Sequence, residues 1–443
     1  MSEGRTTTLG PFPLEIWILV CETLADRISQ DPELHYTKRG PASDLKALCR
    51  VSKGISAEAE RALFRSHHIS PYDFYWKGNP HEQGFSRLLR FIRTVLDRPH
   101  LLSHVRELTL VGPLVELRLW PALLETYGRL AQRLGFDPTA FPLYSLNGWQ
   151  MEGVDTVLRR MSSPSWVNLD ADGTRRQAVG PEILMFLVIP LLPRLKSLVF
   201  TAIKPAWPLP WLDMLGRMSK AGAIKPFDPI VDLRLAWLGF NALDHFVILL
   251  ALCPNVEKLA LWRCNGTGSD EPPFIEQAGA PGFPRNIKTL EMHACVFREP
   301  VVRFLLRSCP NLERFVFHAG SYPAISNLPP TTAIQGGNLL TARKILEALQ
   351  DAKATLKEID VDITRGWSYH EPGGPLTPAD FDDFPVLERA RVAHVGEAAD
   401  DNDADGKSTI LSIGDNTAQL GVEACFQECS GSCSWRYGAR RYL

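Results

Sequence analysis

The chain has 443 residues, of which 45% are hydrophobic and 22% charged, and its formal net charge is −2 at pH 7. This composition is typical of a folded protein. The balance of charge argues against nucleic acid as a partner, because nucleic-acid binders usually carry a basic excess. The longest apolar run covers residues 183–189, whereas a membrane span needs about 20 residues. We therefore predict no nucleic-acid partner and no membrane partner.

The early residues and the cysteines indicate the compartment. Glu15 and Glu22 interrupt the apolar stretch 14–24, which does not match the pattern of a secretory signal peptide. The 9 cysteines are odd in number and widely spread, a pattern typical of reduced thiols rather than of a disulfide framework. We expect a cytoplasmic protein, a nuclear protein, or one present in both compartments.

Three short helices are predicted near the N-terminus. The first is followed by a polar loop over residues 25–43. The second covers residues 45–51, with Ser43 or Asp44 as its cap, and the third covers residues 57–64. Helices this short cannot enclose much core, so a partner or a neighbouring domain is expected to cover their apolar faces.

A fourth, amphipathic helix is predicted between these helices and a repeat region. Apolar residues recur at helical spacing from Phe85, and the helix is expected to end before Pro99.

One pattern then recurs along the chain: an aliphatic residue, two polar residues, an apolar residue, one free position and a further apolar residue. We call it the hexapeptide pattern. It begins at Val105, Leu195, Ile230, Val256, Ile287, Leu312, Leu356 and, in a weaker form, Leu387. The shorter steps between these starts match the period of about 20–29 residues that is typical of a leucine-rich repeat.

A nearly copied phrase shows what one repeat contains. Residues Cys253-Pro254-Asn255 and Cys309-Pro310-Asn311 each stand directly before a hexapeptide pattern, and each follows an aliphatic helical stretch. Each repeat is therefore predicted to be a helix, a Pro-Asn turn and a short strand. One such unit cannot bury its own apolar side, but stacked units bury a continuous core. Eight unrelated strands in an ordinary α/β fold are the alternative.

These observations predict an α/β fold: a short three-helix unit followed by a leucine-rich-repeat-like solenoid of strand-plus-helix units. The expected segments are a disordered N-terminus over 1–11, the three-helix unit over 12–66, a linker helix region over 67–100, the repeat domain over 101–395 with a helical insertion over 113–190, and an acidic loop with a Cys-containing tail over 396–443.

Residues 12–66 resemble an F-box. The resemblance rests on Pro13-Leu14-Glu15-Ile16-Trp17, on Val51-Ser52-Lys53 and on Leu63-Phe64-Arg65. With the repeats, the chain is similar to F-box proteins of filamentous fungi that carry degenerate leucine-rich repeats. The resemblance implies the substrate-recognition subunit of an SCF-type ubiquitin ligase. Such a subunit binds the Skp adaptor, and through it a cullin, and carries no catalytic group.

The resemblance also implies the residues that meet the adaptor. Carried over position by position, they are Pro13, Leu14, Ile16, Leu19, Leu45, Leu48 and Val51, some of which would pack the helices. A non-catalytic repeat scaffold that acts outside a cullin complex is the alternative function. An enzyme is not expected.

A binding surface for the substrate is predicted from strand alternation. Aligning the repeats places Trp262, His293, His318 and Asp362 in one row, and Ala260, Glu291, Val316 and Asp360 in a second. Exposed Trp is enriched at binding hot spots. Glu358, Asp360 and Asp362 make one strand acidic, which would suit a basic segment of a partner. Alternatively, loops 265–285 and 319–340 cover this face.

No metal or other cofactor is predicted. Residues 401–406 match the first half of a calcium-binding EF-hand loop, but Ser412 stands where the bidentate glutamate is required. Cys425, Cys429 and Cys433 share the spacing of one helical face, yet a closed zinc site needs four ligands. A solvated acidic loop and reduced thiols explain both stretches.

Overall fold

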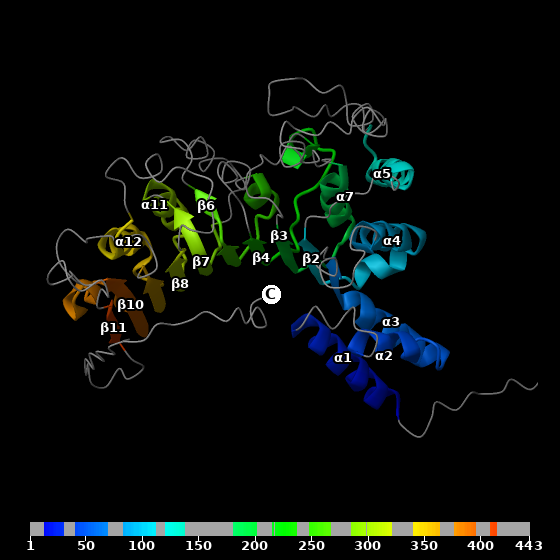
Figure 1. Ribbon diagram of the computed structural model, residues 1–443, viewed down its shortest axis with the longest axis horizontal. Helices are drawn as coiled ribbons and strands as arrows, with labels where there is room; N and C mark the ends of the chain where they lie inside the picture. Colours follow the sequence, from blue (N-terminus) through cyan, green and yellow to red (C-terminus); the bar gives the residue numbers. More distant parts are fainter. Residues whose placement is uncertain are drawn as a thin grey trace, which may run out of the picture. The chain divides into compact units, whose positions relative to one another are not determined.

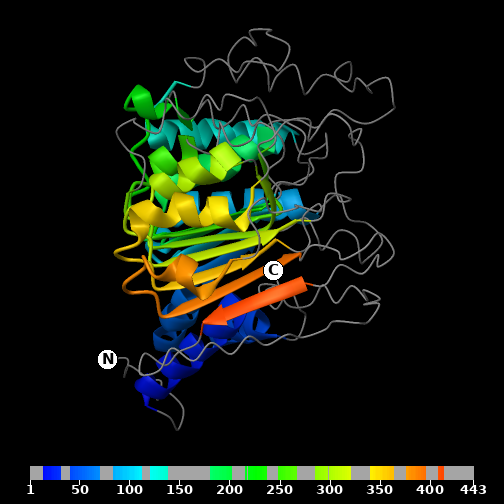
Figure 2. The same cartoon turned by 90° about the vertical axis from the view of Figure 1, so that its left-hand side faces the viewer.

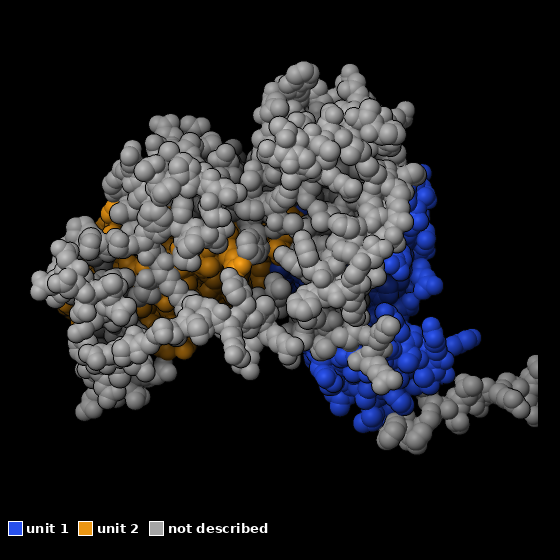
Figure 3. All heavy atoms as spheres, in the orientation of Figure 1, with its two compact units in different colours: residues 1–143, 150–199, 435–443 blue, residues 144–149, 200–434 orange. Residues whose placement is uncertain are grey.

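The computed structural model describes just over half of the chain, in two compact units (Figure 3). Unit 1 comprises residues 1–143, 150–199 and 435–443, and unit 2 comprises residues 144–149 and 200–434. The described residues are 13–30, 40–69, 83–111, 120–137, 180–201, 215–216, 218–236, 248–266, 285–297, 299–320, 340–363, 376–395 and 408–413. The predicted disorder of 1–11 and the acidic stretch and cysteines of the tail lie outside them.

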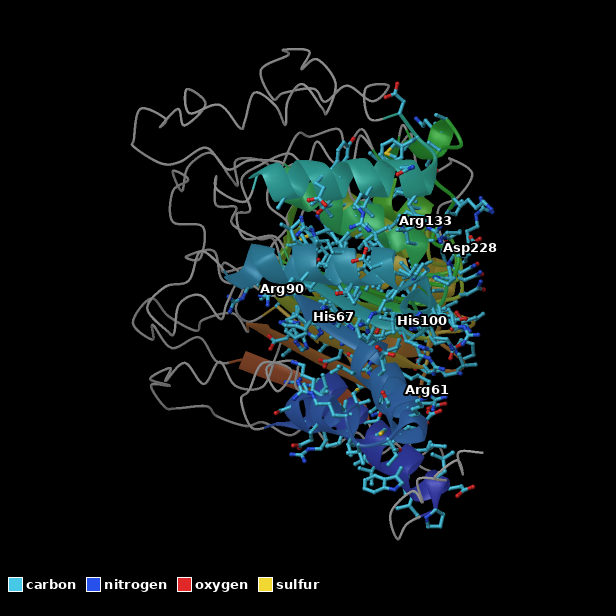
Figure 4. All side chains as sticks on the ribbon, turned by 90° about the vertical axis from the view of Figure 1, so that its right-hand side faces the viewer. Arg61, His67, Arg90, His100, Arg133 and Asp228 are labelled. Carbon is cyan, nitrogen blue, oxygen red and sulfur yellow. The ribbon has the colours of Figure 1, made fainter. Side chains whose placement is uncertain are left out.

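Three helices begin unit 1 (Figure 1): α1 (Leu14–Gln30), α2 (Pro41–Leu48) and α3 (Lys53–Arg65). They share one small core, whose buried members are Cys21, Ala25, Ile28, Ala42, Leu45, Ala59 and Ala62. The Ser52 hydroxyl accepts a hydrogen bond from the Ile55 amide and caps α3. Arg61 of α3, labelled in Figure 4, pairs with Glu22 of α1 at 3.5 Å.

The loop predicted between the first two helices is shorter than expected. α1 continues to Gln30 because Ala25 and Ile28 extend its buried face. α2 begins at Pro41, with Gly40 rather than Ser43 or Asp44 as its N-cap. Proline suits the first turn because the amide it lacks would have no partner there. Both changes add helix at the expense of the predicted loop.

The rest of unit 1 combines parallel strands with helices. The strands are β1 (Ser66–Ile69), β2 (Glu107–Val111) and β3 (Ser197–Thr201), in that order, and the last two residues of β3 belong to unit 2. The helices are α4 (Gln83–Asp97), η3 (Pro99–Ser103), α5 (Trp120–Leu134), α7 (Gly180–Val188) and η7 (Ile189–Leu191). The fourth predicted helix is α4, and it ends before Pro99 as expected.

Strand β1 was not predicted from the sequence. It pairs in parallel with β2, with Ser66 opposite Glu107. His67 (Figure 4) occupies a position where most of the other strands carry an aliphatic residue, and its ring stacks on Phe91 of α4 with centroids 4.2 Å apart. An aromatic contact thus replaces the aliphatic signal that marks the other strands.

Unit 2 is an ordered series of parallel strands. They are β4 (Asp232–Ala236), β5 (Lys258–Trp262), β7 (Thr289–Phe297), β8 (Arg314–Ala319), β9 (Glu358–Asp362) and β10 (Arg389–Val395). Neighbours in this order pair in parallel, and the short β6 (Asn265–Gly266) pairs with β7. β11 (Ser408–Ile413) closes the series antiparallel to β10. β11 falls in the segment that was predicted as loop and tail.

Helices of unit 2 alternate with its strands and lie against one face of them (Figure 2). They are α11 (Glu299–Arg307), α12 (Ala342–Leu349), η9 (Gln350–Ala352) and η10 (Pro378–Phe381), together with helical residues 215–216, 218–220 and 248–252. The predicted α/β class is therefore confirmed, and the alternation is compatible with a solenoid.

All eight hexapeptide patterns form strands. Each strand begins two residues after the first aliphatic residue of its pattern. In β5 the side chains of Leu259 and Leu261 are fully buried, as are Leu290 and Met292 in β7. The prediction that the two apolar positions of the strand, two residues apart, point into the core is therefore confirmed.

The copied Cys-Pro-Asn phrase has a structural role at each turn. The Asn255 side-chain amide donates to the carbonyl of Asp228 at 3.0 Å, and Asn311 donates to that of Arg285 at 3.3 Å. Each asparagine thus ties its own turn to the preceding one. Burial raises the pKa of the Cys309 thiol to about 12 and also raises that of Cys253. Both thiols therefore stay protonated and act as packing groups.

The strand register predicts that truncating an inward residue costs more stability than truncating its outward neighbour. Leu290→Ala should lower the free energy of unfolding by about 2–5 kcal/mol, because it leaves a cavity in the core. Thr289→Ala, one residue away on the other face, should cost under about 0.5 kcal/mol. Guanidinium chloride denaturation of both variants measures the difference. Equal losses would show that the register is wrong.

A carboxylate links two helices of unit 2. Glu299, in the first turn of α11, pairs with Arg303 of the same helix and with Lys344 of α12, whose Nζ lies 2.7 Å from Oε2. Burial raises the pKa of this carboxyl, but the hydrogen bonds and charges of Lys344 and Arg303 outweigh burial and lower it below 4.5.

This lowered pKa predicts a pH-dependent contribution to stability. A carboxyl whose folded pKa lies below its unfolded pKa stabilises the fold above the unfolded value, and the contribution is lost as the pH falls. Glu299→Gln should therefore cost about 1–2 kcal/mol at pH 7 and progressively less below about pH 4.5. Thermal melting against pH measures this, with the exposed Glu347→Gln as the matched control. The same loss at pH 3 and at pH 7 would contradict the prediction.

Candidate functional site

The first candidate surface is a group of exposed apolar side chains on the N-terminal helices. Leu14, Ile16, Leu19, Val20 and Val51 expose 37%, 43%, 60%, 37% and 60% of their surface, respectively. Ile16, Leu19 and Val20 have the i, i+3, i+4 spacing that places side chains on one helix face. The core residues Cys21, Ala25 and Ile28 lie on the other side of α1, where Leu14, seven residues before Cys21, stands at the exposed start of the helix. We call the five exposed residues the apolar patch.

Two of the residues assigned to the adaptor contact lie elsewhere. Leu45 is fully buried in the core of the three helices, and Leu48 is half-buried against that core. Leu45 therefore packs α2 against its neighbours, which is the helix-packing role that the resemblance allowed for some of these residues. Pro13 is exposed, and its carbonyl accepts a hydrogen bond from the Ile16 amide at 3.1 Å, which begins α1. Val20 belongs to the patch but was not predicted. Because Val20 follows Ile16 by four residues, the sequence already indicated that both lie on one face of the helix.

The second candidate surface is the face of unit 2 that lies opposite the buried aliphatic side chains. The register places Trp262 opposite His293, His293 opposite His318, and His318 opposite Asp362. The predicted row therefore exists. The second row is also present, although two of its members, Ala260 and Val316, are buried.

The centre of this face is a chain of side-chain contacts. The Trp262 and His293 rings lie 4.3 Å apart between centroids. The Nδ1 atoms of His293 and His318 face each other at 3.4 Å. His293 Nε2 lies 3.7 Å from Glu291 Oε2, and His318 Nε2 lies 3.2 Å from Asp360 Oδ2.

Cations compensate the acidic side chains of this face. Lys258 Nζ lies 3.0 Å from Glu291, and Arg391 Nη1 lies 3.5 Å from Asp360. Glu358 is shared by Arg314 and Arg389, each at 3.4 Å.

Two consequences follow for the predicted acidic strand. Glu358 and Asp360 are not free acids, so β9 does not present the acidic surface that the sequence suggested for a basic segment. The partners lie on neighbouring strands, about 30 to 45 residues away along the chain, and no local motif revealed them.

The two carboxylates beside the histidines are held in the ionised form. The contact with His293, together with Lys258, lowers the pKa of Glu291 to about 2. Burial raises the pKa of Asp360, but His318 and then Arg391 outweigh burial and lower it. Both carboxylates therefore accept hydrogen bonds and do not donate them at neutral pH.

A ladder of alternating charge is formed by the residues that directly precede β5, β7, β8, β9 and β10. Its members are Glu257, Lys288, Glu313, Lys357 and Glu388. Lys288 lies 3.2 Å from Glu257, and Lys357 lies 2.8 Å from Glu313. The ladder lines a shallow hollow of about 380 Å³. Sequence reasoning missed it, although the alternation at the second position of the hexapeptide pattern was a visible signal.

Comparison with known proteins adds no relative. No protein-family model matches the chain, and no curated protein matches it. Among the described residues, no helix is long and apolar enough to cross a membrane.

The division between buried and exposed leucines on the N-terminal helices predicts different effects of truncation. Leu45→Ala should lower the free energy of unfolding by about 2–5 kcal/mol, whereas Leu19→Ala should change it by under about 0.5 kcal/mol. Hydrogen exchange of the amides in α1 to α3 measures both effects. A larger loss for Leu19 than for Leu45 would show that α1 is rotated from its described orientation.

Proposed function

We propose that this protein is the substrate-recognition subunit of an SCF-type ubiquitin ligase. In this proposal residues 12–66 are an F-box that binds the Skp adaptor and through it a cullin. The strand-and-helix units are degenerate leucine-rich repeats that hold a protein substrate. The protein has no catalytic role of its own, because other subunits transfer ubiquitin.

The apolar patch is the observation that carries the proposal. Five aliphatic side chains stand exposed on a unit whose own core is small. Fully burying one such side chain is worth about 1.5–3 kcal/mol, so covering the patch would yield several kcal/mol. Ile16, Leu19 and Val20 share one face of α1, and grouped exposed apolar side chains mark an interaction site. Leu14 and Ile16 belong both to the patch and to the motif that resembles an F-box.

The sheet face of unit 2 supports the substrate part of the proposal. Trp262 is half-buried beside His293, so its ring is held in place while part of it remains accessible. Rigid aromatic side chains are favoured at binding hot spots. Because the nearby charges are paired, this face suits a partner that reads shape and hydrogen bonds rather than one attracted by net charge.

The adaptor contact is testable by charge insertion. Leu14→Asp and Ile16→Asp should each abolish co-purification with the Skp adaptor, because an unpaired charge buried in an apolar groove costs several kcal/mol. Folding should be unaffected, since both side chains are exposed. The measurement is adaptor and cullin recovery from cells that express each variant, with melting temperature as the check on folding.

Two exposed valines of unit 2 provide matched controls. Val231 and Val386 expose 38% and 40% of their surface, close to the values for Leu14 and Ile16. Val231→Asp and Val386→Asp should retain the adaptor at the wild-type yield. Retention in all four variants would reject the F-box assignment. If the wild-type protein recovers neither adaptor nor cullin, the repeat scaffold acting outside a cullin complex becomes the better description.

A further inference from the structure

The first strands of unit 1 carry a row of cations at the position where unit 2 carries the ladder of alternating charge. The residues that directly precede β1, β2 and β3 are Arg65, Arg106 and Lys196. Backbone hydrogen bonds hold them side by side. The Arg106 amide donates to the Arg65 carbonyl at 2.9 Å, and the Lys196 amide donates to the Arg106 carbonyl at 2.7 Å. Three positive charges therefore occupy adjacent positions, without the alternation of sign seen in unit 2.

Acidic side chains compensate only part of this row. Asp26 of α1 lies 2.9 Å from Arg65, and Glu107 accepts a hydrogen bond from the Ser66 hydroxyl at 2.9 Å. The side chains of Arg106 and Lys196 are exposed. In the part of the chain that the structure describes, no acidic side chain pairs with either of them. Like charges on neighbouring strands destabilise a sheet, so a negative group from outside would relieve the repulsion between these two.

The turns before β2 and β3 add two more basic side chains. His104 and Arg194 each stand directly before a hexapeptide pattern. Burial lowers the pKa of His104, and the nearby charges of His100 and Arg61 lower it further. Arg194 also lowers this pKa, whereas Glu60 raises it, so both lie close to the His104 ring. Arg194 is exposed and, like Arg106, forms no ion pair with a described acidic side chain. We call the following four residues the basic block: His104, Arg106, Arg194 and Lys196.

The dimensions of the basic block suit a short acidic segment. Adjacent strands lie about 4.7–4.9 Å apart, so a block on two strands is narrow. Alternate side chains of an extended segment stand about 7 Å apart on one side, a separation that long Arg and Lys side chains can span. A nucleic acid fits less well, because a protein that makes about 6–10 phosphate contacts needs more cations than the block holds. The formal net charge of −2 also opposes a polyanion.

We propose that the basic block binds an acidic segment of a partner protein, with Arg106, Arg194 and Lys196 pairing with its Asp or Glu side chains. An arginine can bind a carboxylate through two parallel hydrogen bonds, and a lysine adds a compact point charge. Because the cations are exposed, salt screens the attraction, and the block contributes more to the rate and orientation of association than to its strength. The proposal does not rest on the F-box assignment, and its test needs neither adaptor nor cullin.

The test uses the full-length protein and a fluorescent synthetic peptide of about ten residues in which Glu and Ser alternate. Fluorescence anisotropy at low salt should show binding that weakens as sodium chloride is added. Arg106→Glu and Lys196→Glu should each weaken it roughly three- to tenfold, because each replaces a modest attraction with a repulsion. The double variant should weaken it further than either single change. Melting temperatures should stay at the wild-type value, since both side chains are exposed.

An exposed lysine of unit 2 provides the matched control. Lys353 stands shortly before β9, and Lys353→Glu changes the net charge by the same amount as Lys196→Glu. This variant should bind the peptide as tightly as the wild type. An equal loss in Lys353→Glu would show that net charge alone matters and would overturn the proposal. Wild-type affinity in the double variant would overturn it too, as would a wild-type protein that binds no peptide.

Two other occupants of the block have their own outcomes. A single-stranded DNA of about ten nucleotides carries a comparable negative charge. If it binds more tightly than the peptide and loses affinity in the same variants, the block is a nucleic-acid site and the proposal is wrong. The second occupant is the acidic stretch of this chain itself. If peptide binding appears only after Asp400, Asp401, Asp403 and Asp405 are changed together to Asn, that stretch fills the block and no external segment is needed.

Discussion

The architecture of unit 2 depends on one backbone contact that recurs at each step from strand to strand. The carbonyl of the residue before one strand accepts hydrogen bonds from two consecutive amides at the start of the next. Glu257 accepts from Lys288 and Thr289 at 2.8 and 3.0 Å, and Lys288 in turn accepts from Glu313 and Arg314 at 2.8 and 2.9 Å. In unit 1, Arg106 accepts from Lys196 and Ser197 in the same way. Because side chains alternate along a strand, fixing this one contact fixes which face every later side chain occupies.

This register places equivalent positions side by side, which makes like charges costly. Neighbouring strands lie about 4.7–4.9 Å apart, and like charges directly opposite each other destabilise a sheet. The ladder that begins at Glu257 avoids this cost by alternating sign, and Glu358 avoids it by pairing with arginines of both adjacent strands. His293 and His318 are an exception, since the same polar group occupies two adjacent positions. Their Nδ1 atoms lie 3.4 Å apart, within hydrogen-bond distance, so one ring can donate to the other.

The sequence was sufficient to predict those parts of the fold that follow from aliphatic spacing. Leu259 and Leu290 lie inward because each begins an alternating pair in the hexapeptide pattern, and the register follows from aligning these pairs. β1 could not be found in this way, because His67 reaches the core through a stacked ring rather than an aliphatic chain. The start of α2 at Pro41 was missed because its first turn has little apolar periodicity.

The candidate site was predictable in its rows but not in its contacts. Strand alternation placed Trp262, His293 and His318 on one face, and the register confirmed that they are neighbours. The compensation of Asp360 by Arg391 depends on two residues 31 positions apart meeting across a strand pair. Side-chain direction also mattered for the two rings, since the row alone does not say which nitrogens face each other.

The two candidate surfaces differ in the physical forces that would hold a partner. The apolar patch gains its free energy from removing Leu19 and its neighbours from water, a force that depends on area and has little directionality. The sheet face gains from fixed geometry, because Trp262 and the two histidines are held by contacts on three adjacent strands. An apolar patch suits a constant partner whose groove matches its shape, whereas a polar face with rigid aromatic groups suits selective recognition. The proposed function, which joins an invariant adaptor to a chosen substrate, needs one surface of each kind.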